Sequence, residues 1–279
     1  MRKDKGLRSE SENTDGYNPI VFGHRGASGI EVENTYRSFD RAIEIGADGL
    51  ESDCWLLKDG KVVLFHDKFI PKKKESSHII DINRKLDEGD TSEAFNIRKL
   101  TSDQLQSLSF PNGEKIPLLD EFFEKYLEAK SSRGELVKFS LDCQDLRVYK
   151  KIIDLIKTYN LYERVFLCST NLLTLHRIRQ TDPKVQSVAS NLGTNISESQ
   201  LRKDGKISNL GISAFNIQAC SLKAQQVNLL RRYGYGLFVW DLHTKEDLQS
   251  FFPFRPDAIY SNYPDIATRI RDEYLSGCE

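Results

Sequence analysis

The 279-residue chain is 39% hydrophobic and 10% aromatic, which is enough apolar material for a substantial core and argues against disorder. Its 40 basic residues nearly balance its 41 acidic residues, and the formal net charge is −1. This balance excludes a long-range attraction to nucleic acid or to an anionic membrane, so any anion must be bound locally. No apolar run is long enough for a transmembrane helix, although transient contact with a membrane stays open.

The first 18 residues are polar and lack the apolar region of a signal peptide, and they predict a disordered tail. Residues 19–279 are expected to form a single domain. Five cysteines are scattered without CxxC spacing, at positions 54, 143, 168, 220 and 278. Scattered cysteines in odd number are typical of free thiols in a reducing compartment, so we expect a cytoplasmic protein.

Beyond the tail, β-rich runs alternate with amphipathic stretches. The predicted strands are Ile20–His24, Gly49–Leu56, Lys61–His66, Val137–Cys143, Arg164–Ser169, Val185–Ser190, Ala214–Ile217, Gly236–Leu242 and Ala258–Ser261. The predicted helices include Tyr36–Ile45, Ile116–Lys130, Leu146–Tyr159, Leu172–Gln180, Leu222–Tyr233 and Thr244–Phe251. Strands and helices that alternate with short connections are typical of βαβ units and a parallel sheet.

One junction is too short for a parallel crossover. Only Lys58–Lys61 separates the second run from the third, and its Lys-Asp-Gly sequence favours a hairpin turn. We therefore expect Lys61–His66 to lie antiparallel beside Gly49–Leu56. Removing it leaves eight strands, each followed by a helix, which predicts a (β/α)₈ TIM barrel with a β-hairpin and a small insertion of about 61–111 after strand two. The run Lys72-Lys73-Lys74 in this insertion is expected to be a solvated loop, or else to hold anionic substrates.

Three carboxylates are expected to meet inside the barrel, near the C-terminal ends of its strands. Alternation with period two puts Glu51 and Asp53 on one face of the second strand, and Asp142 on the matching face of the next. Three adjacent carboxylates repel one another and raise each other's pKa unless a cation neutralises them. A set of oxygen ligands suits Mg²⁺ or Ca²⁺ better than zinc.

Two histidines and an arginine end strands at the same rim, where the catalytic groups of such barrels lie. His24 and Arg25 follow strand one, and His66 ends the returning hairpin strand. Two histidines beside a metal can act as general base and general acid, and an arginine matches the oxygens of a phosphate. Gly26, without a side chain, is expected to let the backbone pass close to that phosphate. Together these groups predict attack on a phosphodiester.

The sequence also resembles the glycerophosphodiester phosphodiesterases, from about Ile20 to Tyr263 and most densely over 22–67. The matching segments are His24-Arg-Gly, Glu33-Asn-Thr, Gly46-Ala-Asp-x-x-Glu51-x-Asp53, Lys58-Asp-Gly and His66-Asp67, with weaker matches at Ile116-Pro-Leu-Leu-Asp-Glu, Phe139-Ser-Leu-Asp142 and Trp240. The resemblance implies a TIM barrel and a Mg²⁺- or Ca²⁺-dependent cleavage. It further implies that the substrate's own glycerol hydroxyl attacks, which gives a cyclic phosphate that water opens to glycerol 3-phosphate.

The resemblance implies a role for each matching residue. His24 and His66 would be the acid and base, and Glu51, Asp53 and Asp142 the metal ligands. Arg25 would contact phosphate, with Gln144 at the neighbouring phosphate-facing position, while Trp240, Glu33 and Asn34 would belong to the substrate pocket. Arg25 could instead only pair with Glu33, Glu33-Asn34 could only cap the following helix, and Trp240 could only pack at the barrel mouth.

The chain departs from the family pattern at the ends of three strands. The usual Glu-x-Lys is Asp142-Cys143-Gln144, which removes a cation from the phosphate site. The usual Trp-Thr is Trp240-Asp241, and the usual Thr-Asp is Ser261-Asn262. Two other functions therefore stay open beside glycerophosphodiester hydrolysis: a lysophospholipase D-type reaction on lysophospholipids, and a barrel that binds phosphodiesters without turnover. The oligomeric state is not indicated by the sequence.

Overall fold

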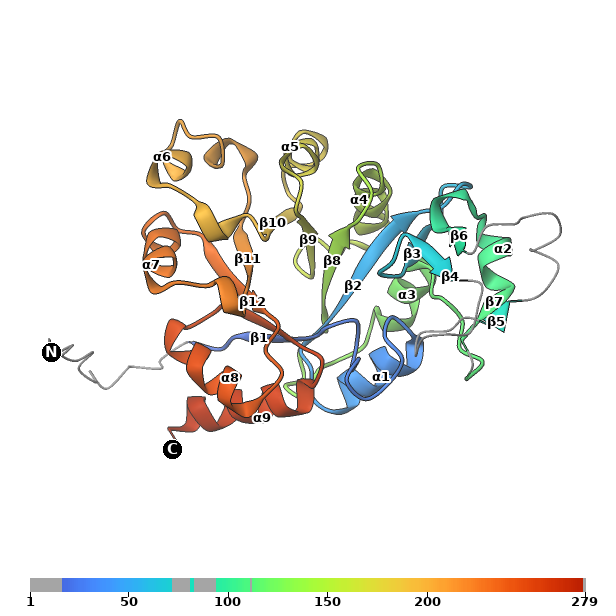
Figure 1. Cartoon of the computed structure of the whole chain (residues 1–279), viewed down its shortest axis with the longest axis horizontal. Helices are drawn as coiled ribbons and strands as arrows, with labels where there is room; N and C mark the ends of the chain where they lie inside the picture. Colours follow the sequence, from blue (N-terminus) through green and yellow to red (C-terminus); the bar gives the residue numbers. More distant parts are fainter. Residues whose placement is uncertain (1–16, 72–80, 83–93, 111, 278–279) are drawn as a thin grey trace, which may run out of the picture.

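The computed structural model describes residues 17–71, 81–82, 94–110 and 112–277. Eight parallel strands form its central barrel, in the order β1 (Ile20–Gly23), β2 (Gly49–Leu56), β8 (Lys138–Cys143), β9 (Val165–Ser169), β10 (Gln186–Ser190), β11 (Ala214–Gln218), β12 (Gly236–Trp240) and β13 (Ala258–Ser261) (Figure 1). β1 pairs with both β13 and β2, which closes the ring. The predicted TIM barrel is therefore confirmed.

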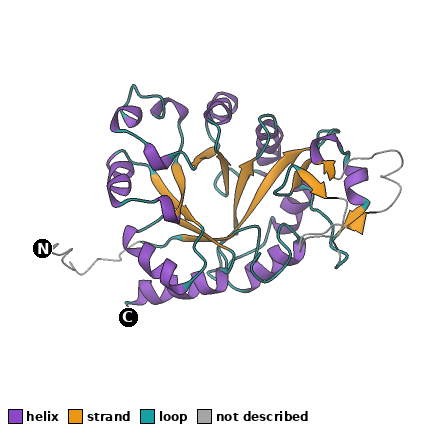
Figure 2. Cartoon of the chain, viewed as in Figure 1, coloured by secondary structure: helices purple, strands orange, loops and turns teal. Residues whose placement is uncertain are grey.

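Each barrel strand is followed by a helix that covers the outside of the barrel (Figure 2). These helices are α1 (Tyr36–Glu44), α3 (Leu119–Tyr126), α4 (Val148–Tyr159), α5 (Leu172–Thr181), α6 (Glu198–Leu201), α7 (Ala224–Arg232), α8 (Lys245–Phe251) and α9 (Pro264–Ser276). Short 3₁₀ turns occur at η3 (Gly193–Asn195), η4 (Ser208–Leu210), η5 (Ala219–Ser221) and η6 (Phe252–Phe254). Among the described residues, no helix combines the length and the apolar character needed to cross a membrane.

Several elements are shorter than predicted, and for two of them a local reason is visible. The helix expected at Ile116–Lys130 begins only at Leu119, because Leu118 still bridges to Val63 of the hairpin strand. The strand expected to reach Leu242 ends at Trp240, because the next residue, Asp241, has a φ of +71° and turns the chain away from the sheet.

The antiparallel hairpin is confirmed. β3 (Val62–Leu64) runs back beside β2, with Cys54 opposite Leu64 and Leu56 opposite Val62. The turn contains Gly60 at a φ of +85°, which glycine adopts without steric strain. The hairpin returns the chain to the C-terminal end of the barrel, where His66 follows β3.

The insertion after the hairpin forms a small core together with β2 and the hairpin strand. Its elements are β4 (Phe69–Pro71), β5 (Asp81–Ile82), β6 (Ala94–Asn96), η2 (Ile97–Lys99), α2 (Ser102–Gln106) and β7 (Leu108–Ser109), with β4 paired to β6 and β5 to β7. The buried side chains of Ile70, Phe95 and Leu105 belong to this core. An ion pair of 2.6 Å between Arg98 and Asp145 joins the insertion to the segment after β8. Lys72-Lys73-Lys74 lies outside the described residues.

The barrel interior below the strand ends is filled by aromatic rings. Phe22 stacks on Tyr260 with ring centroids 5.0 Å apart, and Phe166 meets Phe22 edge to face. The same interior cluster includes Phe238. This apolar layer lies below the C-terminal strand ends, where the catalytic groups of such barrels are found.

Candidate active site

A pocket of about 170 Å³ lies at the C-terminal ends of the barrel strands. It is lined by His24, Arg25, Glu51, Asp53, His66, Ser140, Asp142, Gln144, Thr170, Ser190, Asn191, Asn216, Trp240 and Tyr260. The structure thus brings together every site residue predicted from the sequence except Glu33 and Asn34. The lining residues come from almost the entire circumference of the barrel, so the fold itself assembles the site.

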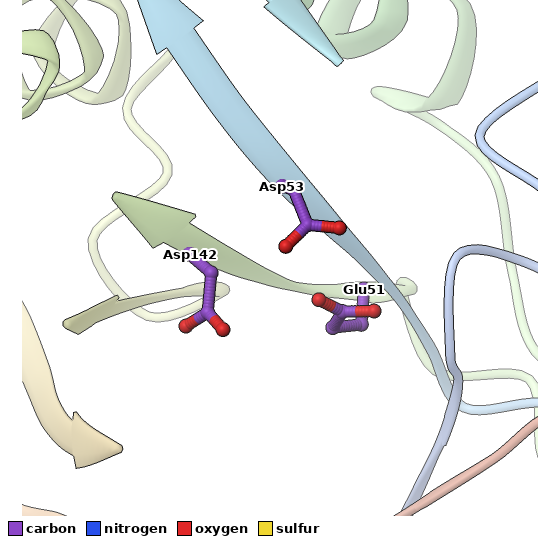
Figure 3. A group of neighbouring side chains, drawn as sticks. All are labelled: Glu51, Asp53 and Asp142. Atoms are coloured by element: carbon purple, nitrogen blue, oxygen red, sulfur yellow. The ribbon is translucent and has the colours of Figure 1, made fainter. Parts of the chain in front are cut away.

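The three carboxylates converge from two neighbouring strands. Asp53 of β2 lies directly opposite Asp142 of β8 in the parallel register, and Glu51 is two residues earlier on the same face of β2. Figure 3 shows the three side chains directed into one space. Carboxylate oxygens from all three residues lie within 4.8 Å of one another. The exposed fractions of Glu51 and Asp53 are only 5% and 3%, so water does little to screen their mutual repulsion.

This concentration of buried charge changes the protonation of the cluster. Burial raises the pKa of Glu51 well above its usual range, and Asp53 and Asp142 raise it further. Burial, with Asp53, raises the pKa of Asp142 to about 7. Asp53 Oδ2 is buried without a hydrogen bond from the described residues, although Arg25 Nε lies 3.2 Å away. An oxygen-only donor set with uncompensated negative charge fits a hard divalent cation such as Mg²⁺ or Ca²⁺.

We expect Asp142→Asn to stabilise the metal-free protein at pH 8. An acid whose pKa is raised by folding stabilises the fold while it is protonated, and that contribution is lost as pH rises from its ordinary value of 3.8 to about 7. Asparagine has no charge to lose, so the variant's melting temperature should exceed that of the wild type above pH 7. The excess should disappear as pH falls toward 4. Thermal melts in chelator across this range measure it, and a constant difference would contradict the assignment.

Arg25 lies between carboxylates at the rim of the pocket. Its φ of +54° places it in the left-handed region, and this turn directs its backbone N–H to Glu51 Oε2 at 2.9 Å. Its guanidinium lies 3.0 Å from Glu33 and 3.2 Å from Asp53. The pairing with Glu33 considered from the sequence is therefore present. Because Arg25 also lines the pocket, its cationic group is within reach of a bound anion.

The two histidines reach the pocket in different environments. His24 Nδ1 lies 2.6 Å from Asn262 Oδ1, and its Nε2 lies 3.8 Å from Glu51 Oε2. Burial lowers the pKa of His24, and the positive charge of Arg25 lowers it further. His66 is 43% exposed, and its Nδ1 lies 2.9 Å from Asp67 Oδ1. One ring is thus held neutral inside the barrel, while the other is accessible to solvent.

Gln144 and Trp240 complete the predicted lining. The Gln144 side-chain amide donates a hydrogen bond of 2.7 Å to Asp53 Oδ1, so the residue in the position of the family's lysine contacts the carboxylate cluster directly. Trp240 Nε1 donates to Asn191 Oδ1 at 3.1 Å, which fixes the indole at the pocket wall. Trp240 is thus one of the residues that line the pocket.

The Glu33-Asn34 segment supports the site from outside the pocket. Glu33 contacts Arg25, whereas the Asn34 side chain accepts a hydrogen bond of 2.6 Å from Ser52 on the outward face of β2. Asn34 is thus directed away from the place predicted for it, because its φ of +54° turns the chain at this point. Neither residue caps α1, since the cap is Thr35.

The structure gives a packing reason for Gly26. Its φ is +82°, and a Cβ atom at this position would lie 2.4 Å from Ser38 Oγ. The missing side chain therefore lets the loop after β1 pack against α1. The expected approach of the backbone to a phosphate at this position stays a prediction.

The sequence interpretation missed several polar residues of the pocket. Ser190 Oγ donates to Asp142 Oδ1 at 3.3 Å, and Ser140 shares a hydrogen bond of 2.9 Å with the buried Tyr260 hydroxyl. Asn216, Asn191 and Thr170 also line the wall. For Ser190, Asn191, Asn216 and Thr170 position was the available signal, because they lie at or just after the ends of predicted strands. Their residue types alone did not distinguish them from ordinary turn residues.

Comparisons with known proteins agree with this geometry. The profile of the glycerophosphoryl diester phosphodiesterase family matches residues 24–266. A glycerophosphodiester phosphodiesterase of Caldanaerobacter subterraneus subsp. tengcongensis is 28% identical over 88% of this chain and 95% of its own. A solved glycerophosphodiester phosphodiesterase of Parabacteroides distasonis aligns with a TM-score of 0.71 at 20% identity, over 92% of this chain and 98% of its own.

A phosphodiesterase of Oleispira antarctica, solved with its product sn-glycerol-3-phosphate, aligns with a TM-score of 0.70 at 20% identity, over 91% of this chain and 97% of its own. At these identities the solved structures support the barrel fold. The segment that matches the family contains both histidines, the arginine and all three carboxylates of the pocket. The chain therefore belongs to the glycerophosphoryl diester phosphodiesterase family.

Proposed function

We propose that the protein hydrolyses glycerophosphodiesters to glycerol 3-phosphate and an alcohol in a metal-dependent reaction. The observation that carries this proposal is the group of Glu51, Asp53 and Asp142, which lines one pocket together with His24 and His66. The product bound to the Oleispira relative, sn-glycerol-3-phosphate, is the product expected of this reaction.

Glu51, Asp53 and Asp142 would hold Mg²⁺ or Ca²⁺, which when bound supplies a Lewis acid for the phosphoryl oxygens. Ser190 and Gln144 would orient two of these carboxylates, because each donates a hydrogen bond to one of them. Such supporting hydrogen bonds determine how rigidly ligands are held. Arg25 would bind a phosphate oxygen with its guanidinium, and Trp240 would bound the space for the alcohol group.

We assign the general base to His24 and the general acid to His66. His24 is mostly buried and neutral, with Nε2 near the carboxylate cluster, so it can accept the proton of an attacking hydroxyl. In the first step that hydroxyl belongs to the substrate's glycerol, and a cyclic phosphate forms as the alcohol leaves. His66 then donates a proton to the leaving oxygen. In the second step the roles reverse and water opens the cyclic phosphate.

Lysophospholipids are a second candidate substrate, which exposed hydrophobic side chains on the surface support. Most of the large hydrophobic side chains exposed in the described part of the chain lie in the segments that follow barrel strands or His66: Ile30, Leu146, Leu172, Leu173, Tyr263 and Phe69. Apolar side chains around the mouth could contact an acyl chain that the pocket itself cannot hold.

We expect release of glycerol 3-phosphate or its cyclic form only when Mg²⁺ or Ca²⁺ is present. The purified protein is incubated with glycerophosphocholine, lysophosphatidylcholine or glycerophosphoinositol, with each metal and with chelator, and phosphorus NMR identifies the products. A cyclic product that persists would favour the lysophospholipase D-type reaction. Binding of all three compounds without turnover, by folded protein with metal, would contradict hydrolysis and support a non-catalytic binding barrel.

The cellular location is inferred from the cysteines. The thiols of Cys54, Cys143, Cys168 and Cys220 are free, as expected for a reducing compartment. A cytoplasmic location stays a prediction from the sequence.

A further inference from the structure

A chain of hydrogen bonds leads from His24 to His243 and Asp241, two residues that have no role in the mechanism proposed above. Asn262 Oδ1 lies 2.6 Å from His24 Nδ1. The backbone N–H of Asn262 points to His243 Nδ1 at 3.4 Å, and His243 Nε2 lies 2.9 Å from Asp241 Oδ1. Gln218 then donates a hydrogen bond of 2.9 Å to the other carboxylate oxygen of Asp241.

The donors and acceptors of this chain permit one arrangement of protons. A carboxylate can only accept, so His243 must carry its proton on Nε2, opposite Asp241. In the neutral ring Nδ1 is then an acceptor, as required by the backbone N–H of Asn262. The oxygen of the Asn262 side chain also only accepts, so His24 must carry its proton on Nδ1. Its Nε2 is therefore left with a lone pair, as a general base needs.

The backbone holds this arrangement in place. Asp241 is a non-glycine residue at a φ of +71°, and this conformation brings its carboxylate within hydrogen-bonding distance of His243 and Gln218. The main chain of Asn262 is held on both sides, because its carbonyl accepts from Gly29 N–H at 2.9 Å while its own N–H meets His243.

Two of these residues are the departures noted in the sequence. Asp241 and Asn262 replace a threonine and an aspartate of the family pattern, and His243 lies between them in the hydrogen-bond chain. Asn262, which contacts His24, is uncharged, and the carboxylate of Asp241 is linked to His24 through Asn262 and His243. We propose that Asp241 and His243 are positioning residues that hold Asn262 and thereby select the Nδ1-protonated tautomer of His24. This inference rests on the proposed base role of His24, although the tautomer itself can be measured without turnover.

His243→Leu tests the proposal, because it removes both hydrogen bonds while keeping an apolar side chain. We expect kcat to fall by about 10- to 100-fold, the usual effect of losing a group that orients a catalytic residue, with KM and metal affinity unchanged. In metal-free protein labelled at its histidine rings, heteronuclear NMR should show His24 changing from the Nδ1-protonated tautomer to a mixture. With only five histidines in the chain, the ring signals can be assigned one by one.

Two further variants separate positioning from packing. His243→Asn offers an oxygen close to the former Nδ1, so it should accept from Asn262 and recover most of the lost kcat. Asp241→Gly suits the left-handed backbone and leaves His243 without its carboxylate, so it should lower kcat even if His243→Leu does not fold. His176→Leu, the same change on the exposed face of α5, is the control and should have no effect.

An unchanged His24 tautomer in folded His243→Leu and Asp241→Gly protein would overturn the proposal, whatever happens to activity. So would a His243→Asn variant as slow as His243→Leu. If no variant or wild-type protein turns over substrate, the proposed function fails, while the tautomer measurement still decides the positioning role.

Discussion

His24→Ala is expected to lower kcat by about 10²- to 10⁴-fold, the range by which a positioned general base accelerates a reaction. Its Nε2 lies 3.8 Å from Glu51, at the edge of the carboxylate cluster, and burial keeps the ring neutral and able to accept a proton. KM should change little, because the phosphate is assigned to Arg25 and the metal site. Steady-state kinetics with glycerophosphocholine and saturating metal measure the effect.

His176→Ala is the matched control for this experiment. His176 lies exposed on α5, outside the pocket, so its loss should leave kcat unchanged. His66→Ala should reproduce most of the loss, and the double variant His24→Ala/His66→Ala should be little slower than either single one, because an acid and a base that act together are not additive. Full activity of folded His24→Ala protein would remove the histidine from the mechanism.

Asp53→Asn is expected to lower activity by about 10³-fold, because the several kcal/mol that a metal contributes to the transition state correspond to such a factor. Asp53 lies between the other two carboxylates in the network, opposite Asp142 and on the face of Glu51. Metal binding should weaken at the same time, which titration calorimetry measures directly. Metal should also raise the melting temperature of the wild type more than that of the variant.

Asp154→Asn provides the control. Asp154 is exposed on α4, so this substitution removes one negative charge far from the pocket. It should bind metal and turn over substrate like the wild type. In Asp53→Asn the Gln144 amide faces a second amide in place of the carboxylate to which it donates. Gln144→Ala keeps all three carboxylates, so it should lower activity less than Asp53→Asn. Unchanged calorimetric metal affinity in Asp53→Asn would show that the cation is held elsewhere.

Several features of the fold and site could be predicted from the sequence because they depend on local geometry. Alternation along a strand placed Glu51 and Asp53 on one face, and the short Lys58–Lys61 turn required an antiparallel hairpin. Strand ends indicated His24 and His66. These inferences need only the pleat of a strand, the length of a turn and the direction of parallel strands, all of which neighbouring residues determine.

Other features could not be predicted, because they depend on contacts between distant parts of the chain. The packing of α1 and the loop before it against the barrel directs Asn34 toward Ser52. The same packing brings Gly26 against Ser38. A backbone turn at a non-glycine residue, as at Asp241, leaves no mark in composition or periodicity.

The sequence by itself determined the barrel, the hairpin, the pocket rim and the residue types that meet there. Only the tertiary structure decided which of them touch. His24 and Asn262 are 238 residues apart in the chain, and the closure of β1 against β13 alone brings them to 2.6 Å. Strand register sets Asp53 against Asp142, and barrel closure sets His24 against the Asn262–His243–Asp241 chain. Such distances depend on the packing of all eight strands at once, whereas residue types and local periodicity are fixed by the sequence alone.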